Sequence, residues 1–91
     1  MIITVLIEDK VHDSLLYEHG LSFSIQYNDN HYLLDAGTTA SFINNAKTLN
    51  IPLDDLKACF LSHGHYDHAG GFKALIETYN NITIYAMESA L

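Results

Sequence analysis

The feature that most restricts the fold of this chain is a histidine-rich segment between an apolar run and an amphipathic one. The segment Ser62–Gly71 reads SHGHYDHAGG and holds three of the chain's six histidines. The run before it, Ala58–Ser62, is short and apolar, as in a buried strand, and the run after it, Ala69–Tyr79, repeats apolar residues at helical spacing. Those residues are Phe72, Leu75, Ile76 and Tyr79. The sequence predicts a strand, a loop over His63–His68, and a helix whose apolar stripe faces the core.

The residue types in this loop are metal ligands. Side chains alternate along an extended chain, so His63, His65 and Asp67 can converge on one side, and His68 can turn inward at the start of the helix. Imidazole nitrogens and carboxylate oxygens bind zinc at about 2.0–2.2 Å. Three His and one Asp exceed what one tetrahedral ion easily takes from so short a segment, and two ions with two ligands each fit better. Paired ions about 3.5–4 Å apart can share a bridging hydroxide that acts as a nucleophile.

A solvated histidine-rich loop with adventitious metal affinity is the alternative interpretation. The H-x-H-x-D-H spacing follows an expected strand and precedes an expected helix, which is the context that a metal motif requires. We therefore favour the metal site.

The other elements follow from periodicity and turn residues. Met1–Ile7 is β-branched and apolar, as in a buried strand, and Leu21–Tyr27 alternates apolar with polar residues. A three-residue loop over Asn28–Asn30 and a return strand over His31–Asp35 complete a hairpin. Thr38 or Thr39 can cap a helix. The remaining expected elements are a helix over 40–49 and a strand over 82–86, which gives the order β-β-β-α-β-α-β.

With these motifs the sequence resembles the metallo-β-lactamase-fold hydrolase superfamily. The segment 63–68 matches the family's H-x-H-x-D-H motif, and Asp35 in Leu33–Gly37 (LLDAG) looks like the aspartate of its first motif. Glu18–Phe23 (EHGLSF) together with Ser62–Gly71 looks most like the dihydropterin–aminobenzene phosphate synthase-like branch. The resemblance implies an α+β fold, the N-terminal half of an αββα sandwich, with a mixed sheet and helices on one face.

The resemblance also implies roles for particular residues. His63 and His65 would bind one metal ion, and Asp67 and His68 the second. Asp35 would orient the ligands by hydrogen bonding, although an Asp after a strand can also simply cap the next element. Asp67 is the catalytic candidate, because a metal-bound carboxylate can relay a proton. We expect two Zn²⁺ ions per complete site, with iron or manganese as alternatives for mixed His and Asp ligands.

The resemblance covers only the front half of the family's domain. The rest of a complete member supplies another His to the first metal, a bridging acidic residue and a last His to the second metal. No His or Asp follows His68 in this sequence. We therefore expect residues 1–91 to be a single unit, a partial domain with an incomplete site.

Composition narrows the possible partners. The net charge is −7 and there is no Arg, so no electrostatic footprint for nucleic acid is present. The longest opening apolar run is too short to cross a membrane and lacks the features of a signal peptide. The single cysteine, Cys59, lies in an apolar run and is expected to be a buried thiol. We expect a cytoplasmic protein whose complete form acts on a small-molecule substrate.

Two functional hypotheses remain. In the first, the parent protein is a two-metal hydrolase whose hydroxide attacks an ester, amide-like or phosphoester bond, and this chain is an inactive fragment of it. In the second, the chain is a non-catalytic fragment or a weak metal-binding and self-associating module. A half-sandwich leaves one apolar sheet face uncovered, so we expect a homodimer through that face. A site completed in trans by two chains is a third possibility.

Overall fold

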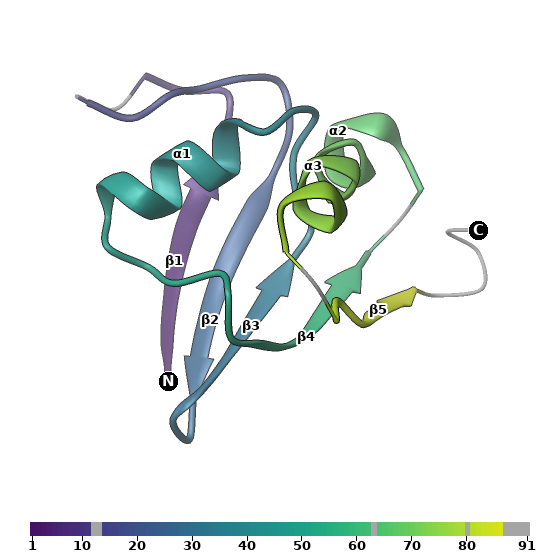
Figure 1. Cartoon of the computed structure of the whole chain (residues 1–91). Coiled ribbons are helices and arrows are strands. Elements are labelled where there is room, and N and C mark those ends of the chain that lie inside the picture. The colour runs from purple at the N-terminus through teal and green to yellow at the C-terminus, as the bar shows by residue number, and fades with distance from the viewer. Residues whose placement is uncertain (12–13, 63, 80, 87–91) are drawn as a thin grey trace.

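The computed structural model describes residues 1–11, 14–62, 64–79 and 81–86. Within these residues the chain forms one mixed sheet of five strands in sequence order (Figure 1). The first three strands pair antiparallel, and the last two continue the sheet in parallel. The strands are β1 (Ile2–Ile7), β2 (Ser22–Tyr27), β3 (Asn30–Leu34), β4 (Leu56–Leu61) and β5 (Ile84–Ala86). The predicted fold class and the order of the strands are confirmed.

The hairpin between β2 and β3 is tighter than predicted. Tyr27 pairs with Asn30, which leaves a two-residue turn instead of the expected three-residue loop. Asn28 and Asp29 have φ angles of 49° and 62°. Two successive positive φ values define a type I′ turn, which matches the twist of paired strands and which Asn and Asp tolerate.

The helices lie on one face of the sheet, as expected (Figure 1). The first is α1 (Ser41–Thr48), and the helix predicted over 69–79 is two helices, α2 (Tyr66–Ala69) and α3 (Gly71–Thr78). The loop predicted through His68 is therefore wrong for its last three residues, which already belong to α2. Neither Thr38 nor Thr39 is the N-cap of α1, although the Thr39 hydroxyl accepts a hydrogen bond from the Ser41 amide.

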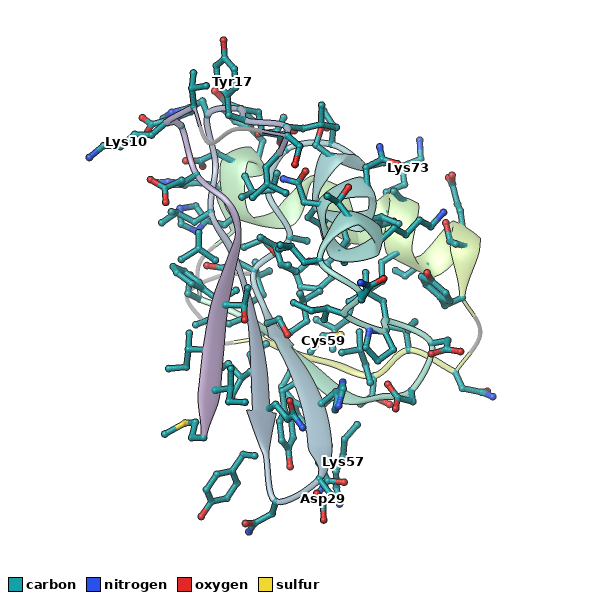
Figure 2. All side chains as sticks on the ribbon, turned by 90° about the vertical axis from the view of Figure 1, so that its left-hand side faces the viewer. Lys10, Tyr17, Asp29, Lys57, Cys59 and Lys73 are labelled. Carbon is teal, nitrogen blue, oxygen red and sulfur yellow. The ribbon has the colours of Figure 1, made fainter. Side chains whose placement is uncertain are left out.

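The core lies between the helices and the covered face of the sheet. Leu33, Cys59, Phe42 and Leu75 are fully buried there. Figure 2 shows Cys59 inside the molecule, while the labelled lysines extend outward. Ile76 is an exception to the predicted stripe, because its side chain is 57% exposed on the outer side of α3.

A polar residue connects the long 8–20 segment to the core. Asn45 of α1 is buried, and its amide donates hydrogen bonds to the carbonyl oxygens of Leu6 and Leu16, at 2.7 and 2.8 Å. Its own oxygen accepts from the Leu16 amide at 2.8 Å. A buried amide with every hydrogen bond made is stabilising only while all its partners stay in place.

The other face of the sheet carries rows of apolar side chains. Cross-strand partners share a face, so the strand register defines two such rows. One row is Val5, Phe23, Leu34, Phe60 and Tyr85, and the other is Ile3, Ile25, Tyr32 and Ala58. The prediction that β1 is a buried strand is correct only for Leu6 and Ile7, since Ile2, Ile3 and Val5 are exposed. A bulge between Val5 and Ile7 turns both Leu6 and Ile7 toward the core.

None of the described helices is long and apolar enough to cross a membrane.

Candidate metal centre

The candidate site lies where β3 and β4 end side by side. Leu34 pairs with Phe60 in parallel register, so the residues that follow these strands are neighbours. Asp35 leaves β3 and Ser62 follows β4. In parallel strands the carboxyl ends meet at one edge, and polar side chains from distant parts of the sequence gather there.

Asp35 is the buried centre of this arrangement. Its carboxylate accepts hydrogen bonds from the Ser62 amide at 2.8 Å and from the Ser62 hydroxyl at 2.5 Å. Its backbone has a φ of 58°, and the Asp35 amide and carbonyl are both bonded, to the Phe60 carbonyl and the Ser22 hydroxyl. A left-handed backbone at a non-glycine residue costs free energy and persists only where neighbouring contacts enforce it. The orienting role of Asp35 toward metal ligands stays a prediction.

The third partner of the Asp35 carboxylate is His68. The Nδ1 atom of His68 lies 2.7 Å from Asp35 Oδ2, and both side chains are buried. Because an ionised carboxylate only accepts hydrogen bonds, the proton of a neutral His68 ring is on Nδ1. The lone pair then lies on Nε2, the nitrogen that can bind a metal ion.

The same nitrogen faces Asp67. The Nε2 atom of His68 lies 3.6 Å from Asp67 Oδ2. The two residues expected to share one ion therefore present their donor atoms to each other. This nitrogen and oxygen pair matches the ligand chemistry of zinc.

The remaining predicted ligands are placed differently. His63 lies outside the described residues. His65 is exposed and stands at the N-cap of α2, where its carbonyl accepts the amides of His68 and Ala69. Across the residues that the structure describes, no three His, Cys, Asp or Glu side chains are grouped so that they would hold an ion. The structure thus brings the side chains of Asp35, Asp67 and His68 next to one another, and the assignment of Asp67 and His68 to one metal ion stays a prediction.

Two glycines let the backbone close around this site. A Cβ atom on Gly71 would overlap the Ala36 carbonyl oxygen, and one on Gly70 would overlap that of Thr38. The Gly71 amide also donates to the Gly37 carbonyl at 3.0 Å. The start of α3 therefore packs directly on the turn that follows Asp35. This packing keeps Asp35 and His68 close to each other.

The segment Glu18–Leu21 also contacts the site, although the sequence pattern gives it no role there. The Glu18 carboxylate accepts the Thr38 and Thr39 amides and the Thr39 hydroxyl. Burial raises the pKa of Glu18, but these hydrogen bonds outweigh it and hold the pKa below its ordinary value. These hydrogen bonds attach the Glu18–Leu21 segment to the turn that follows Asp35.

An open cavity of about 210 Å³ lies beside the donor atoms. Its lining includes Asp67 and His68 from the motif and His19 from the earlier segment. Tyr66, beside Asp67 in the chain, is 66% exposed, and its ring centre lies 6.4 Å from that of His19. A small polar molecule in this cavity would lie beside the side chains of His19, Asp67 and His68.

Comparison with known proteins finds similar sequences over most of the chain. The family model of the metallo-beta-lactamase superfamily matches residues 17–91. The chain is 37% identical over 75 residues to 7,8-dihydropterin-6-methyl-4-(beta-D-ribofuranosyl)-aminobenzene-5'-phosphate synthase of Methanocaldococcus jannaschii, covering 76% of this chain and 26% of that protein. It is 35% identical over 66 residues to hydroxyacylglutathione hydrolase of Buchnera aphidicola, covering 70% of this chain and 25% of that protein.

Solved structures give the same result. A metal-dependent hydrolase of the beta-lactamase superfamily superimposes with a TM-score of 0.64 at 42% identity, over 76% of this chain and 25% of that one. The Rm3 metallo-beta-lactamase superimposes with a TM-score of 0.64 at 32% identity, over 77% and 27%. The chain spans about a quarter to three tenths of the length of the curated relatives it matches. By its sequence and its fold, the chain belongs to the metallo-beta-lactamase superfamily.

Proposed function

We propose that this chain carries the first metal-binding motif of a metal-dependent hydrolase, and that by itself it binds metal without completing the catalytic site. The single observation that carries this proposal is that His68 contacts Asp35 through Nδ1 and Asp67 through Nε2. A buried carboxylate fixes one nitrogen of His68 and leaves the other facing a second carboxylate. Such a geometry is typical of a metal-ligating histidine and has no evident use in a loop that is merely solvated.

The residues that would hold the metal are His63 and His65 for one ion and Asp67 and His68 for the other. When bound, such a metal pair activates water as a nucleophile and polarises the bond to be cleaved. Asp35 keeps the His68 proton on Nδ1. We assign the relay of a proton to the Asp67 carboxylate, because Asp67 lines the cavity and its side chain is 17% exposed.

The substrate class follows from chemistry and from the relatives. An ester, an amide-like bond or a phosphoester has an electrophilic centre that an activated water can attack. One relative hydrolyses hydroxyacylglutathione by its name, and another is a pterin-related phosphate synthase. We propose a small molecule with such a bond as the substrate of the complete protein, and zinc as its metal, with iron or manganese as alternatives.

The test compares two forms of the protein. The 91-residue chain, stripped of metal and reloaded with Zn²⁺, is expected to bind zinc but to hydrolyse p-nitrophenyl acetate and bis-p-nitrophenyl phosphate no faster than free zinc does. The protein extended to the length of its relatives is expected to hydrolyse one of these esters and to lose that activity with a chelator. Hydrolysis that survives complete metal removal would contradict the proposal.

The open sheet face favours a second candidate, a self-associating module. Its apolar rows run across the strands, and a hollow of about 400 Å³ at one end is lined by Phe60 and Tyr85 among others. Phe60 stacks on Tyr85 with ring centres 5.7 Å apart. The two rows contain no charged side chain, although the chain carries a net charge of −7.

We propose a second copy of this chain as the occupant of that face. Two identical faces related by a two-fold axis bury apolar rows against each other without bringing charged side chains of either copy together. Light scattering at micromolar concentration is expected to give a dimer, and the variant Phe60→Lys is expected to give a monomer. Ile76→Lys, at an exposed apolar residue on α3, serves as the control that stays dimeric. A monomeric wild-type chain would refute this module.

A further inference from the structure

We propose that His19 is a positioning residue of the metal centre, which together with His68 holds the Asp67 carboxylate in place. This role rests on the proposed function, since it concerns the residue expected to bind metal beside His68. His19 belongs to no position of the H-x-H-x-D-H motif and lies 48 residues before Asp67.

The contact itself is direct. The Nε2 atom of His19 lies 3.4 Å from Asp67 Oδ2, and the same oxygen lies 3.6 Å from His68 Nε2. Two imidazoles thus flank one carboxylate oxygen. His68 cannot follow a rotation of Asp67, because Asp35 fixes its ring at Nδ1. His19 contacts the same oxygen, so that together the two rings restrict where it can move.

The backbone around His19 is hydrogen-bonded to Thr38 and to Asp67 of the metal motif. The His19 carbonyl accepts the Thr38 hydroxyl at 2.7 Å, and the Leu21 amide donates to the Asp67 carbonyl at 3.1 Å. Gly20, between them, approaches Asp67 so closely that a Cβ atom there would lie 2.6 Å from the Asp67 carbonyl oxygen. Only glycine permits this approach, and the approach brings His19 within reach of the carboxylate.

Exposure separates the positioning role from that of a buried structural histidine. The His19 side chain is 71% exposed, whereas that of Asp67 is only 17% exposed. A side chain on the solvent side of the cavity contributes little to the core, so its removal should leave folding intact. Removal of the His19 side chain should instead change the orientation of the Asp67 carboxylate that it contacts.

The first experiment examines the contact without metal. In the metal-free chain, Asp67→Asn is expected to shift the ring ¹⁵N resonances of His19 and to leave those of His31 unchanged. His31 is a suitable reference because its own partner is Asp55, with 3.8 Å between Nδ1 and Oδ1. Unchanged His19 resonances in Asp67→Asn would overturn the proposal.

The second experiment measures zinc affinity by competition with a chromophoric chelator. His19→Ala is expected to weaken zinc binding by about 10–100-fold, as the loss of ligand-orienting partners does in other metal sites. His19→Gln, which keeps a side-chain N–H, is expected to restore part of the affinity, and His31→Ala is expected to match the wild type. Thermal unfolding of His19→Ala should coincide with that of the wild type.

The outcomes distinguish this role from the proposed function. Wild-type affinity in His19→Ala, together with weakened binding in Asp67→Asn, would overturn the positioning role alone. A wild-type chain that binds no zinc would overturn the proposed function and this role together.

Discussion

Asp35 and His68 lie 33 residues apart in the sequence, and in the structure Asp35 Oδ2 and His68 Nδ1 are 2.7 Å apart. The first leaves β3 and the second belongs to α2, so this contact connects the sheet to the metal motif. It exists because β3 and β4 end together and because Gly71 lets α3 pack on the turn after Asp35. The contact fixes the orientation of the ring whose other nitrogen faces Asp67.

Asp35→Asn is predicted to weaken zinc binding without unfolding the chain. Asn tolerates the left-handed backbone at this position and keeps an acceptor for the Ser62 amide. It removes the charge that holds the His68 proton on Nδ1, so zinc affinity is expected to fall by about 10–100-fold. Chelator competition measures the affinity, and circular dichroism checks the fold. Full zinc affinity in Asp35→Asn would show that Asp35 only caps the end of β3.

Asn45→Ala is predicted to destabilise the fold by about 3 kcal/mol. It removes three hydrogen bonds and leaves the Leu6 carbonyl buried without that partner. Asn44→Ala is the matched control, because Asn44 is the preceding residue of the same helix and is exposed. Urea unfolding of both variants measures the difference, and equal midpoints would contradict the role given to Asn45.

Glu18 is predicted to stabilise the chain in a pH-dependent way. Hydrogen bonds hold the pKa of Glu18 below its ordinary value of 4.5 in the folded chain. A carboxyl group whose pKa is lower when folded contributes stability above pH 4.5, and this contribution disappears as the pH falls through the folded pKa. The unfolding midpoint of the wild type should therefore exceed that of Glu18→Gln at pH 7 and approach it in acid. Glu77→Gln, on the exposed side of α3, is the control for the loss of one exposed carboxylate.

Cys59 is predicted to be inert in the folded chain. Burial raises the pKa of the Cys59 thiol from 9.0 to about 11. The thiol should react with a disulfide reagent at pH 8 only after unfolding in urea, because the thiolate is the nucleophile. Since the unfolded chain loses the thiol proton first, the stability of the wild type relative to Cys59→Ala should decrease between pH 9 and 11. Rapid labelling of the native protein would contradict this placement.

Local sequence patterns predict the elements and the motif because both depend on neighbouring residues. The order of strands and helices and the buried thiol of Cys59 follow from periodicity and apolar character. The two-residue turn at Asn28 and Asp29 does not follow, since a turn between alternating strands does not reveal its own length. The exposure of Ile76 does not follow either, because an apolar side chain on a helix does not show which side the sheet covers.

The details of the site depend on contacts that the sequence pattern does not show. The hydrogen bonds of Ser62 to Asp35 and the contact of His19 with Asp67 join residues 27 and 48 positions apart. Such contacts follow from how the strands align and how closely the glycines allow the backbone to pack. The one signal available in the sequence is the run Glu18–Phe23, which the resemblance singles out without giving His19 a role.

The most direct test of the account is the zinc affinity of the 91-residue chain with and without the facing donor atoms of Asp67 and His68. Chelator competition would compare the wild type with the double variant Asp67→Asn/His68→Phe, and His31→Phe would serve as the control. We predict that the wild type and the control bind zinc with the same affinity and stoichiometry, and that the double variant loses the ion assigned to Asp67 and His68 while the His63 and His65 pair is retained. Equal zinc affinity and stoichiometry in all three proteins would contradict the assignment of a metal centre to this motif.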